Sequence, residues 1–260
     1  MWDAKSDHYD MTVRQARGIR KTLKRIIDSC DVYPRKGTFV DSVSLALFLR
    51  MCEVHETICI LVGKGLHRDA VVLGRGLCES AITHYWMTNK DVNRRFDRYV
   101  HFLGKIQKQN IAVVEKHYGH KQALTKEQLD LVRETEKHFK NFGKQWNDVK
   151  IGEMAYEADA YETLPDGSSV NMAVSYDLFY WWFSLLAHPS IEAIQNFLPP
   201  QGSVFRSSRK PTVRRTLQED EVLFLSTTWL LMIASRIDTV MSLGQDKEFE
   251  KTLLRIRKSK

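Results

Sequence analysis

Apolar residues recur at the spacing of helix faces along most of the chain. In the first such segment Val13, Ile19 and Leu23 share one side of a helix whose other positions are mainly basic. No stretch alternates between apolar and polar residues for long enough to form a sheet. The pattern predicts helices over residues 8–30, 41–62, 68–87, 92–117, 125–142, 176–188 and 218–243.

Turn-forming residues mark the breaks between these helices, at Tyr33–Gly37, at Gly63–Gly65 and at Gly244. Residues 143–172 have the least regular pattern. We therefore predict an all-α fold, a multi-helix bundle with helical N- and C-terminal additions. Its predicted parts are a basic N-terminal helix (residues 1–40), a core helical domain (41–198), and a basic loop with a C-terminal helix packed on the core (199–260).

The composition is that of a globular protein, because 43% of the 260 residues are hydrophobic and 27% are charged. The apolar run Leu223–Ala234 is shorter than a bilayer crossing and contains Ser226, Thr227 and Thr228. Residues 1–10 carry several charges and lack the apolar centre of a signal peptide. These observations predict a cytoplasmic protein without a membrane partner.

The cysteine pattern argues against disulfides and zinc. Cys30, Cys52, Cys59 and Cys78 form no C-x-x-C pair, and three of them lie in apolar helical segments, so we expect buried reduced thiols. The chain contains no Glu-x-x-His pair for a di-metal centre on helices, and no glycine-rich phosphate loop. We expect neither a metal nor a cofactor.

Basic residues are clustered rather than spread evenly, within a net charge of +7. One cluster lies on the N-terminal helix, a second in a late loop and a third at the end of the chain. These clusters are candidate phosphate-binding surfaces, and solvated faces are the alternative. The loop residues proposed to bind nucleic acid are Arg206, Arg209, Lys210, Arg214 and Arg215.

Two apolar segments each carry two polar residues one helical turn apart. Arg75 and Glu79 lie in the first segment, and Ser184 and His188 lie in the second, which Pro189 is expected to end. Charged groups on apolar helices need partners when they are buried. We predict that these four side chains converge on one catalytic site.

Each of the four also has a structural explanation. Arg75 and Glu79 fit an ion pair that fixes helix register, and His188 fits a helix C-terminus stabilised by the dipole. Ser184 fits a hydrogen bond to a carbonyl one turn back, because no nucleophile elbow surrounds it. The residues expected to surround the site are His55, Glu56, Tyr180 and Arg95.

Several short motifs resemble a known family. They are Gly65–Ala70, Leu73–Glu79, Arg95–Tyr99, Trp146–Ala155 and Tyr176–Ser190. Together they look like a widespread, uncharacterised bacterial family of all-helical proteins, over residues 45–195. The order of a helix ending in Glu and a later helix ending in His is also similar to the HEPN superfamily of helical ribonucleases and nucleotide-associated domains, which implies an HEPN-like core.

The HEPN resemblance implies specific chemistry. In those ribonucleases an Arg four to six residues before a His holds the scissile phosphate, and the His assists proton transfer at the ribose 2′-oxygen. His188 matches, but Trp182, Phe183 and Ser184 fill the positions where the Arg would stand. Metal-independent cleavage by that motif is therefore in doubt unless Arg75 supplies the charge from a neighbouring helix.

The resemblance implies an RNA- or nucleotide-directed effector, with a ribonuclease-like toxin of a phage-defence system as its enzymatic form. The alternative is a non-enzymatic helical interaction or sensor module that forms a homodimer through its aromatic helix. In that helix, Tyr176–Phe183 carries bulky aromatic residues on all sides, which predicts a homo-oligomer or another partner protein. Both hypotheses stay open at this point, and so does the question of enzymatic activity.

Overall fold

A computed structural model describes residues 11–29, 39–118, 125–127, 129–130, 133, 149–159, 172–187 and 217–257. Every regular element in the described residues is helical, and these residues contain no strand. The prediction of an all-α protein is confirmed.

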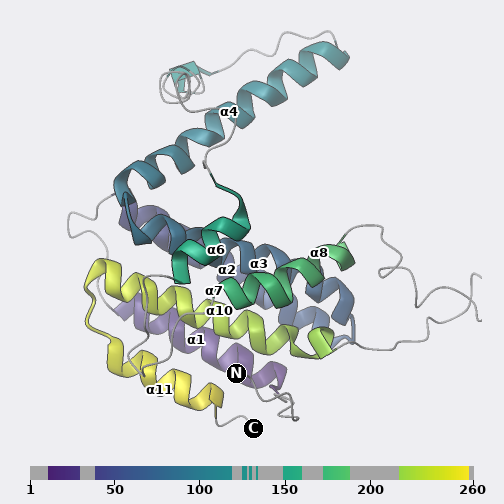
Figure 1. Cartoon of the computed structure of the whole chain (residues 1–260), viewed down its shortest axis with the longest axis vertical. Helices are drawn as coiled ribbons and strands as arrows, with labels where there is room; N and C mark the ends of the chain where they lie inside the picture. Colours follow the sequence, from purple (N-terminus) through teal and green to yellow (C-terminus); the bar gives the residue numbers. More distant parts are fainter. Residues whose placement is uncertain are drawn as a thin grey trace, which may run out of the picture.

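The elements follow one another along the chain as a series of helices (Figure 1). Their bounds are α1 Val13–Ser29, α2 Phe39–Gly63, α3 His67–Asn89, α4 Val92–Tyr118, α6 Ile151–Asp159, α7 Met172–Val174, η1 Ser175–Tyr180, α8 Trp181–Ala187, α10 Leu217–Met241 and α11 Asp246–Arg257.

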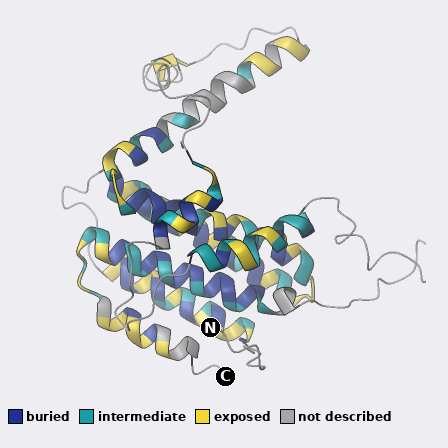
Figure 2. Cartoon of the chain, viewed as in Figure 1, coloured by how far each residue is buried: buried dark blue, intermediate teal, exposed yellow. Residues whose placement is uncertain are grey.

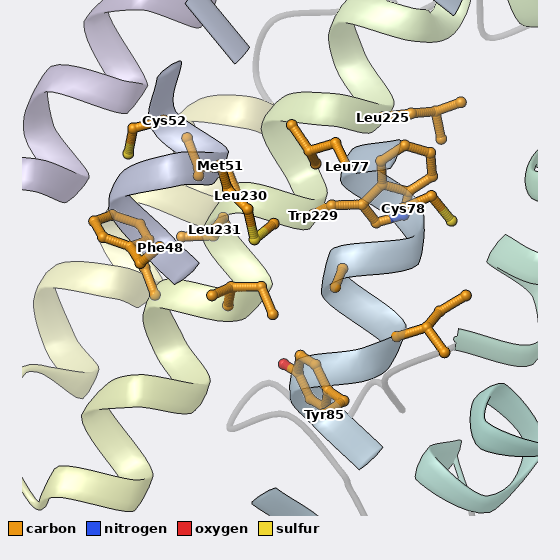
Figure 3. Close-up of a cluster of buried hydrophobic side chains, with 14 of the residues drawn as sticks. Phe48, Met51, Cys52, Leu77, Cys78, Tyr85, Leu225, Trp229, Leu230 and Leu231 are labelled. Atoms are coloured by element: carbon orange, nitrogen blue, oxygen red, sulfur yellow. The ribbon is translucent and has the colours of Figure 1, made fainter. Parts of the chain in front are cut away.

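The core lies where α10 packs against both α2 and α3. Phe48 of α2, Leu77 of α3 and Trp229 of α10 are all almost fully buried there (Figure 3). Burial of one such side chain stabilises the fold by roughly 1.5–3 kcal/mol. α10 therefore belongs to the centre of the bundle, although it follows the segments that carry the family motifs.

α1 packs on α2 and α10 through one apolar side. The buried residues of this side are Ala16, Ile19, Leu23, Ile26 and Ile27. Ile19 and Leu23 agree with the predicted pattern, whereas Val13 is only partly buried and Ala16 was not predicted. Two arginines of α1 also hold it to α2. Arg17 binds Glu56 at 3.0 Å, and Arg20 contacts the same carboxylate and donates to the Cys52 carbonyl oxygen at 3.2 Å.

A glycine ends α2, as the sequence predicts. Gly65 has a φ of +75°, and the Gly65 N–H donates to the Val62 carbonyl at 2.9 Å. After α10 the left-handed position is Ser242 instead, which has a φ of +53° and is followed by the Leu243 N–H donating to the Asp238 carbonyl. The predicted Gly244, with a φ of +73°, lies two residues beyond Ser242. Such left-handed positions favour glycine because it has no Cβ.

Two helices were not predicted from the sequence. α6 lies within the segment that has the least regular pattern, and its nine residues give only two turns of periodicity. α11 is rich in charges and buries only Phe249 and Thr252 among its described side chains, so its pattern resembles a solvated tail. The helix predicted over 125–142 lies mostly outside the described residues.

α4 extends away from the bundle, and among its described side chains those that are buried lie at its beginning (Figures 1 and 2). Arg95 and Phe96 in its first turns are buried, whereas Val113 is exposed. The first turns of α4 therefore anchor the helix to α3.

In the described part of the chain, one helix has the length and composition to cross a membrane. The segment Glu221–Met241 of α10 meets this criterion, but 67% of its apolar window is buried inside the bundle. Core helices of soluble proteins meet the same criterion, so this finding is weak evidence for a span. The described cysteines Cys52, Cys59 and Cys78 are buried and free, as expected.

Candidate functional site

The helix that carries the aromatic run contains a π-helical segment. α7, η1 and α8 form one continuous helix from Met172 to Ala187, and the Trp181 N–H donates to the Tyr176 carbonyl, five residues earlier. A π-helical turn is wider than an α-helical one and changes the direction of its side chains. Such turns occur frequently at functional sites.

Glycines on two neighbouring helices leave room for this segment to pack closely against them. A Cβ on Gly152 of α6 would lie 2.9 Å from the Tyr176 ring. A Cβ on Gly74 of α3 would lie 3.0 Å from the Phe183 ring. Because Gly74 allows this close crossing of α3 and α8, the next residue, Arg75, lies within reach of η1.

Arg75 contacts Tyr180 in two ways. Its Nη2 donates to the Tyr180 hydroxyl at 3.2 Å, and its guanidinium carbon lies 5.2 Å from the centre of that ring. The Tyr180 hydroxyl in turn lies 3.5 Å from Glu79 Oε2. The Arg75 Nε is buried and has no hydrogen-bond partner. The hydroxyl of Tyr180 therefore links the two charged residues of α3.

Arg75 and Glu79 do not form the ion pair that the sequence offered as their structural explanation. Arg75 is half-buried and Glu79 is exposed, and no direct ion pair joins them in the described structure. The physical reason is the position of Glu79, which lies on the outer side of α3 beside the edge of η1. Glu79 faces solvent, and the half-buried Arg75 is accessible in part.

Ser184 donates to the Tyr180 carbonyl oxygen at 2.7 Å. This is the backbone hydrogen bond that the sequence offered as the alternative to a nucleophile. His188, the fourth predicted catalytic residue, lies outside the described residues. The five loop residues from Arg206 to Arg215 also lie outside the described residues.

His55 does not lie with Arg75 and Glu79, contrary to the prediction. Its Nε2 is 2.9 Å from the Thr227 hydroxyl, which donates to the Leu223 carbonyl at 2.7 Å. The hydroxyl has a single proton, so it accepts from His55, and the Nδ1 of His55 accepts from the Cys59 thiol at 3.7 Å. Burial lowers the pKa of His55 to about 3, so it is a neutral core histidine.

Glu56 and Arg95, also predicted around the site, belong to two other clusters. Glu56 pairs with the arginines of α1, as described above. Arg95 donates to the Trp86 carbonyl oxygen and, at 2.9 Å, to Glu157, and its guanidinium lies 3.7 Å from the Trp86 ring centre. Of the four predicted neighbours, Tyr180 alone contacts Arg75 and Glu79.

Glu157 is the centre of the Arg95 cluster. It accepts from Trp86 Nε1 at 2.6 Å and from Lys90 at 2.5 Å, in addition to Arg95. Partial burial raises the pKa of Glu157. The hydrogen bonds from Lys90, Arg95 and Trp86 together lower this pKa by more than burial raises it, so the pKa of Glu157 lies below its usual value. This cluster joins α3, α4 and α6 and is structural.

Sequence reasoning missed two contacts beside Tyr180. Tyr156 donates to Asp177 at 2.6 Å, and this hydrogen bond raises the pKa of Tyr156. The Tyr176 ring is stacked on the Tyr180 ring with 5.2 Å between their centres. Tyr156 lies on the unpredicted helix α6, so no periodic signal connected it with η1.

The arrangement offers one positioned cation, one exposed carboxylate and a phenol between them. An arginine in this setting binds anions such as phosphate through its remaining N–H groups. No group of three or more His, Cys, Asp and Glu side chains suited to a metal ion occurs in the described part of the chain. The chemistry available to Arg75, Tyr180 and Glu79 is anion binding and proton transfer.

Comparison with known proteins gives one match. A family model described as "Family of unknown function (DUF5677)" matches residues 41–202. No curated protein and no solved structure matches the chain. The match confirms the resemblance to an uncharacterised family, whereas the remoter HEPN resemblance stays a prediction.

Proposed function

Because the chain belongs to this family of unknown function, which assigns it no activity, we propose from its own residues that it is an RNA- or nucleotide-directed effector. In this proposal Arg75 binds a phosphate of the substrate. The resemblance to HEPN ribonucleases suggests a cytoplasmic toxin of a phage-defence system as the biological setting.

The observation that supports the proposal is that Arg75 is held in place without an ion pair to Glu79. Its guanidinium is fixed by the Tyr180 hydroxyl at 3.2 Å and is not neutralised by a direct ion pair with Glu79. Such a fixed cation is prepared to bind an oxyanion through the N–H groups of its terminal nitrogens, because its side chain is already ordered. A direct ion pair with Glu79 would have neutralised this charge within the protein.

Proton transfer needs a group close to the bound phosphate. Glu79 is an exposed carboxylate 3.5 Å from the Tyr180 hydroxyl, and it is a candidate base. His188, which follows the end of α8 by one residue, is the candidate that the resemblance supplies. In the proposed reaction, a base takes the proton of the ribose 2′-hydroxyl, and the 2′-oxygen bonds to the adjacent phosphorus. The P–O5′ bond breaks, and the leaving 5′-oxygen takes up a proton, which gives a 2′,3′-cyclic phosphate and a 5′-hydroxyl. Arg75 stabilises the charge on the phosphate during this exchange.

The test is cleavage of total RNA by the purified protein, with and without a chelator. Arg75→Ala and His188→Ala should each lower the cleavage rate at least about 100-fold, the scale on which one charge-stabilising or proton-transfer group acts. Arg50→Ala is the matched control, because Arg50 is an exposed arginine on α2 that pairs only with Glu53. Unchanged cleavage by both site variants contradicts the proposal.

A second candidate function is favoured by the exposed apolar residues of the same helix. Leu178 and Trp181 are 55% and 57% exposed, so η1 and α8 present an apolar edge that the bundle leaves uncovered. This edge suits the non-enzymatic module that forms a homodimer. Sedimentation of wild type and of Trp181→Glu tests it, since a dimer built on this edge should dissociate in the variant.

A further inference from the structure

The outward side of α1 is the most strongly basic helix surface in the described structure. The helix contains six basic residues and one acidic residue, Asp28. Its basic residues are Arg14, Arg17, Arg20, Lys21, Lys24 and Arg25. A charge excess of this kind on one helix attracts polyanions.

Three of these cations lie on one line along the helix. Arg14, Lys21 and Arg25 are separated by seven and four residues, which places them on one face at 3.6 residues per turn. This face is opposite the buried side that contains Ile19 and Leu23. The line extends over about 16 Å, at 1.5 Å per residue.

No described carboxylate neutralises the charges of this line. Arg17 and Arg20 pair with Glu56, and this interaction accounts for the two arginines that face α2. Arg14, Lys21 and Arg25 are exposed, and no carboxylate pairs with them among the described residues. Their positive potential is therefore available to a ligand.

Gly18 lies on the same line, between Arg14 and Lys21. A glycine inside an exposed helix costs about 1 kcal/mol relative to alanine. Packing does not explain it, because a Cβ on Gly18 would meet no atom within 4 Å. The absence of a side chain there lets a ligand come close to the helix backbone between two cations.

A basic amphipathic helix can meet nucleic acids, anionic membranes or acidic proteins of the calmodulin type, and the last of these also bind the apolar face of the helix. An interfacial membrane helix inserts its apolar face into the lipid. In α1 this face is already buried against the bundle, with Ala16 and Leu23 fully covered. The electrostatic face alone remains, and it favours nucleic acid.

We propose that Arg14, Gly18, Lys21 and Arg25 form a surface that binds the phosphate backbone of RNA. This inference rests on the proposed function, since it takes RNA as the ligand. The surface makes no base-specific contacts, because it consists of three cations and a glycine without a side chain. It holds the RNA chain independently of sequence while a distinct site, around Arg75, acts on one phosphate.

The test measures binding of a fluorescent single-stranded oligouridylate between 50 and 200 mM salt, about the range in which phosphate contacts dominate. The triple variant Arg14→Gln, Lys21→Gln, Arg25→Gln should lower the salt slope by about 2, which is 0.7 for each of three contacts with a single strand. The control triple variant Lys64→Gln, Lys116→Gln, Lys150→Gln removes the same charge from exposed positions elsewhere. It should change the slope by less than about 0.5.

Gly18→Glu separates binding from folding. Glutamate is a better helix former than glycine, so the variant should melt at the same temperature or higher, yet bind the oligonucleotide at least about tenfold more weakly. Gly18→Gln is its neutral control and should bind more tightly than Gly18→Glu. Equal salt slopes for the two triple variants overturn the inference, and so does binding to phosphatidylserine vesicles without binding to RNA.

The outcomes also distinguish this inference from the proposed function. If the α1 variants weaken binding while Arg75→Ala cleaves as wild type does, the surface is supported and the proposed site is wrong. If wild type cleaves RNA through Arg75 but the two triple variants bind alike, the proposed function stands and the inference about α1 is overturned.

Discussion

Two buried histidines should make the protein sensitive to mild acid. Burial lowers the pKa of His55 and of His84 from 6.5 to about 3, with a further lowering of the His84 pKa by the charge of Arg236. His84 is fully buried, and neither of its ring nitrogens has a hydrogen-bond partner. Its ring contacts the Phe96 ring edge-on, at 6.4 Å between centres.

The pH dependence of the stability follows from the lowered pKa values of the two histidines. A histidine with a lowered pKa in the folded state binds its proton more readily when unfolded, so its stabilising contribution is complete above pH 6.5 and is lost as the pH falls toward 3. A pH of 5 is about 1.5 units below the pKa of a histidine in the unfolded chain. At that pH each buried histidine lowers the free energy of unfolding by about 2 kcal/mol relative to neutral pH, and the two together lower it by about 4 kcal/mol.

The assay is chemical denaturation followed by far-ultraviolet circular dichroism at pH 7.5 and pH 5. The variant His84→Phe keeps a ring of similar size against Phe96 and removes one titrating group, so the loss of unfolding free energy on acidification should fall by about half. His117→Gln, at an exposed position on α4, is the control and should behave as wild type. If His84→Phe loses as much stability on acidification as wild type, the reasoning about His84 is refuted.

Three further predictions concern the site and its supports, each measured by denaturant unfolding. Glu79→Gln should change stability by less than about 1 kcal/mol, because Glu79 is exposed, and a larger loss would show a buried pair. Glu157→Ala should cost about 3 kcal/mol because it leaves the buried Arg95 without its carboxylate, and a loss below about 1 kcal/mol contradicts this. Gly152→Ala should cost about 1–3 kcal/mol, since its Cβ would lie 2.9 Å from the Tyr176 ring, and a neutral effect would mean that this ring moves easily.

The sequence by itself determined the class of the fold and most of its helices. The apolar spacing in α1 identified the residues that are buried, because a helix in a bundle must cover one side. Gly65 ended α2 at the expected place, since the left-handed conformation favours glycine, whereas the left-handed position after α10 is Ser242, two residues before the expected Gly244. These features depend on residues close together in the chain, so local rules were sufficient.

The sequence also placed Arg75, Glu79 and Tyr180 among the candidates, because charged and aromatic residues in an apolar segment stand out. It could not decide which of them are exposed. That Glu79 faces solvent depends on how α3 meets η1, and this crossing is set by the closeness that Gly74 allows to Phe183.

The tertiary structure alone decided the partners of the remaining polar residues. His55 bonds to Thr227, which is 172 residues later in the chain, and Arg95 meets Glu157 on a helix that the pattern did not predict. The π-helical turn, likewise, has no periodic signature in its six residues. A side chain binds whatever donor or acceptor the packing of distant helices brings within about 3 Å, and spacing along the sequence carries no information about that distance.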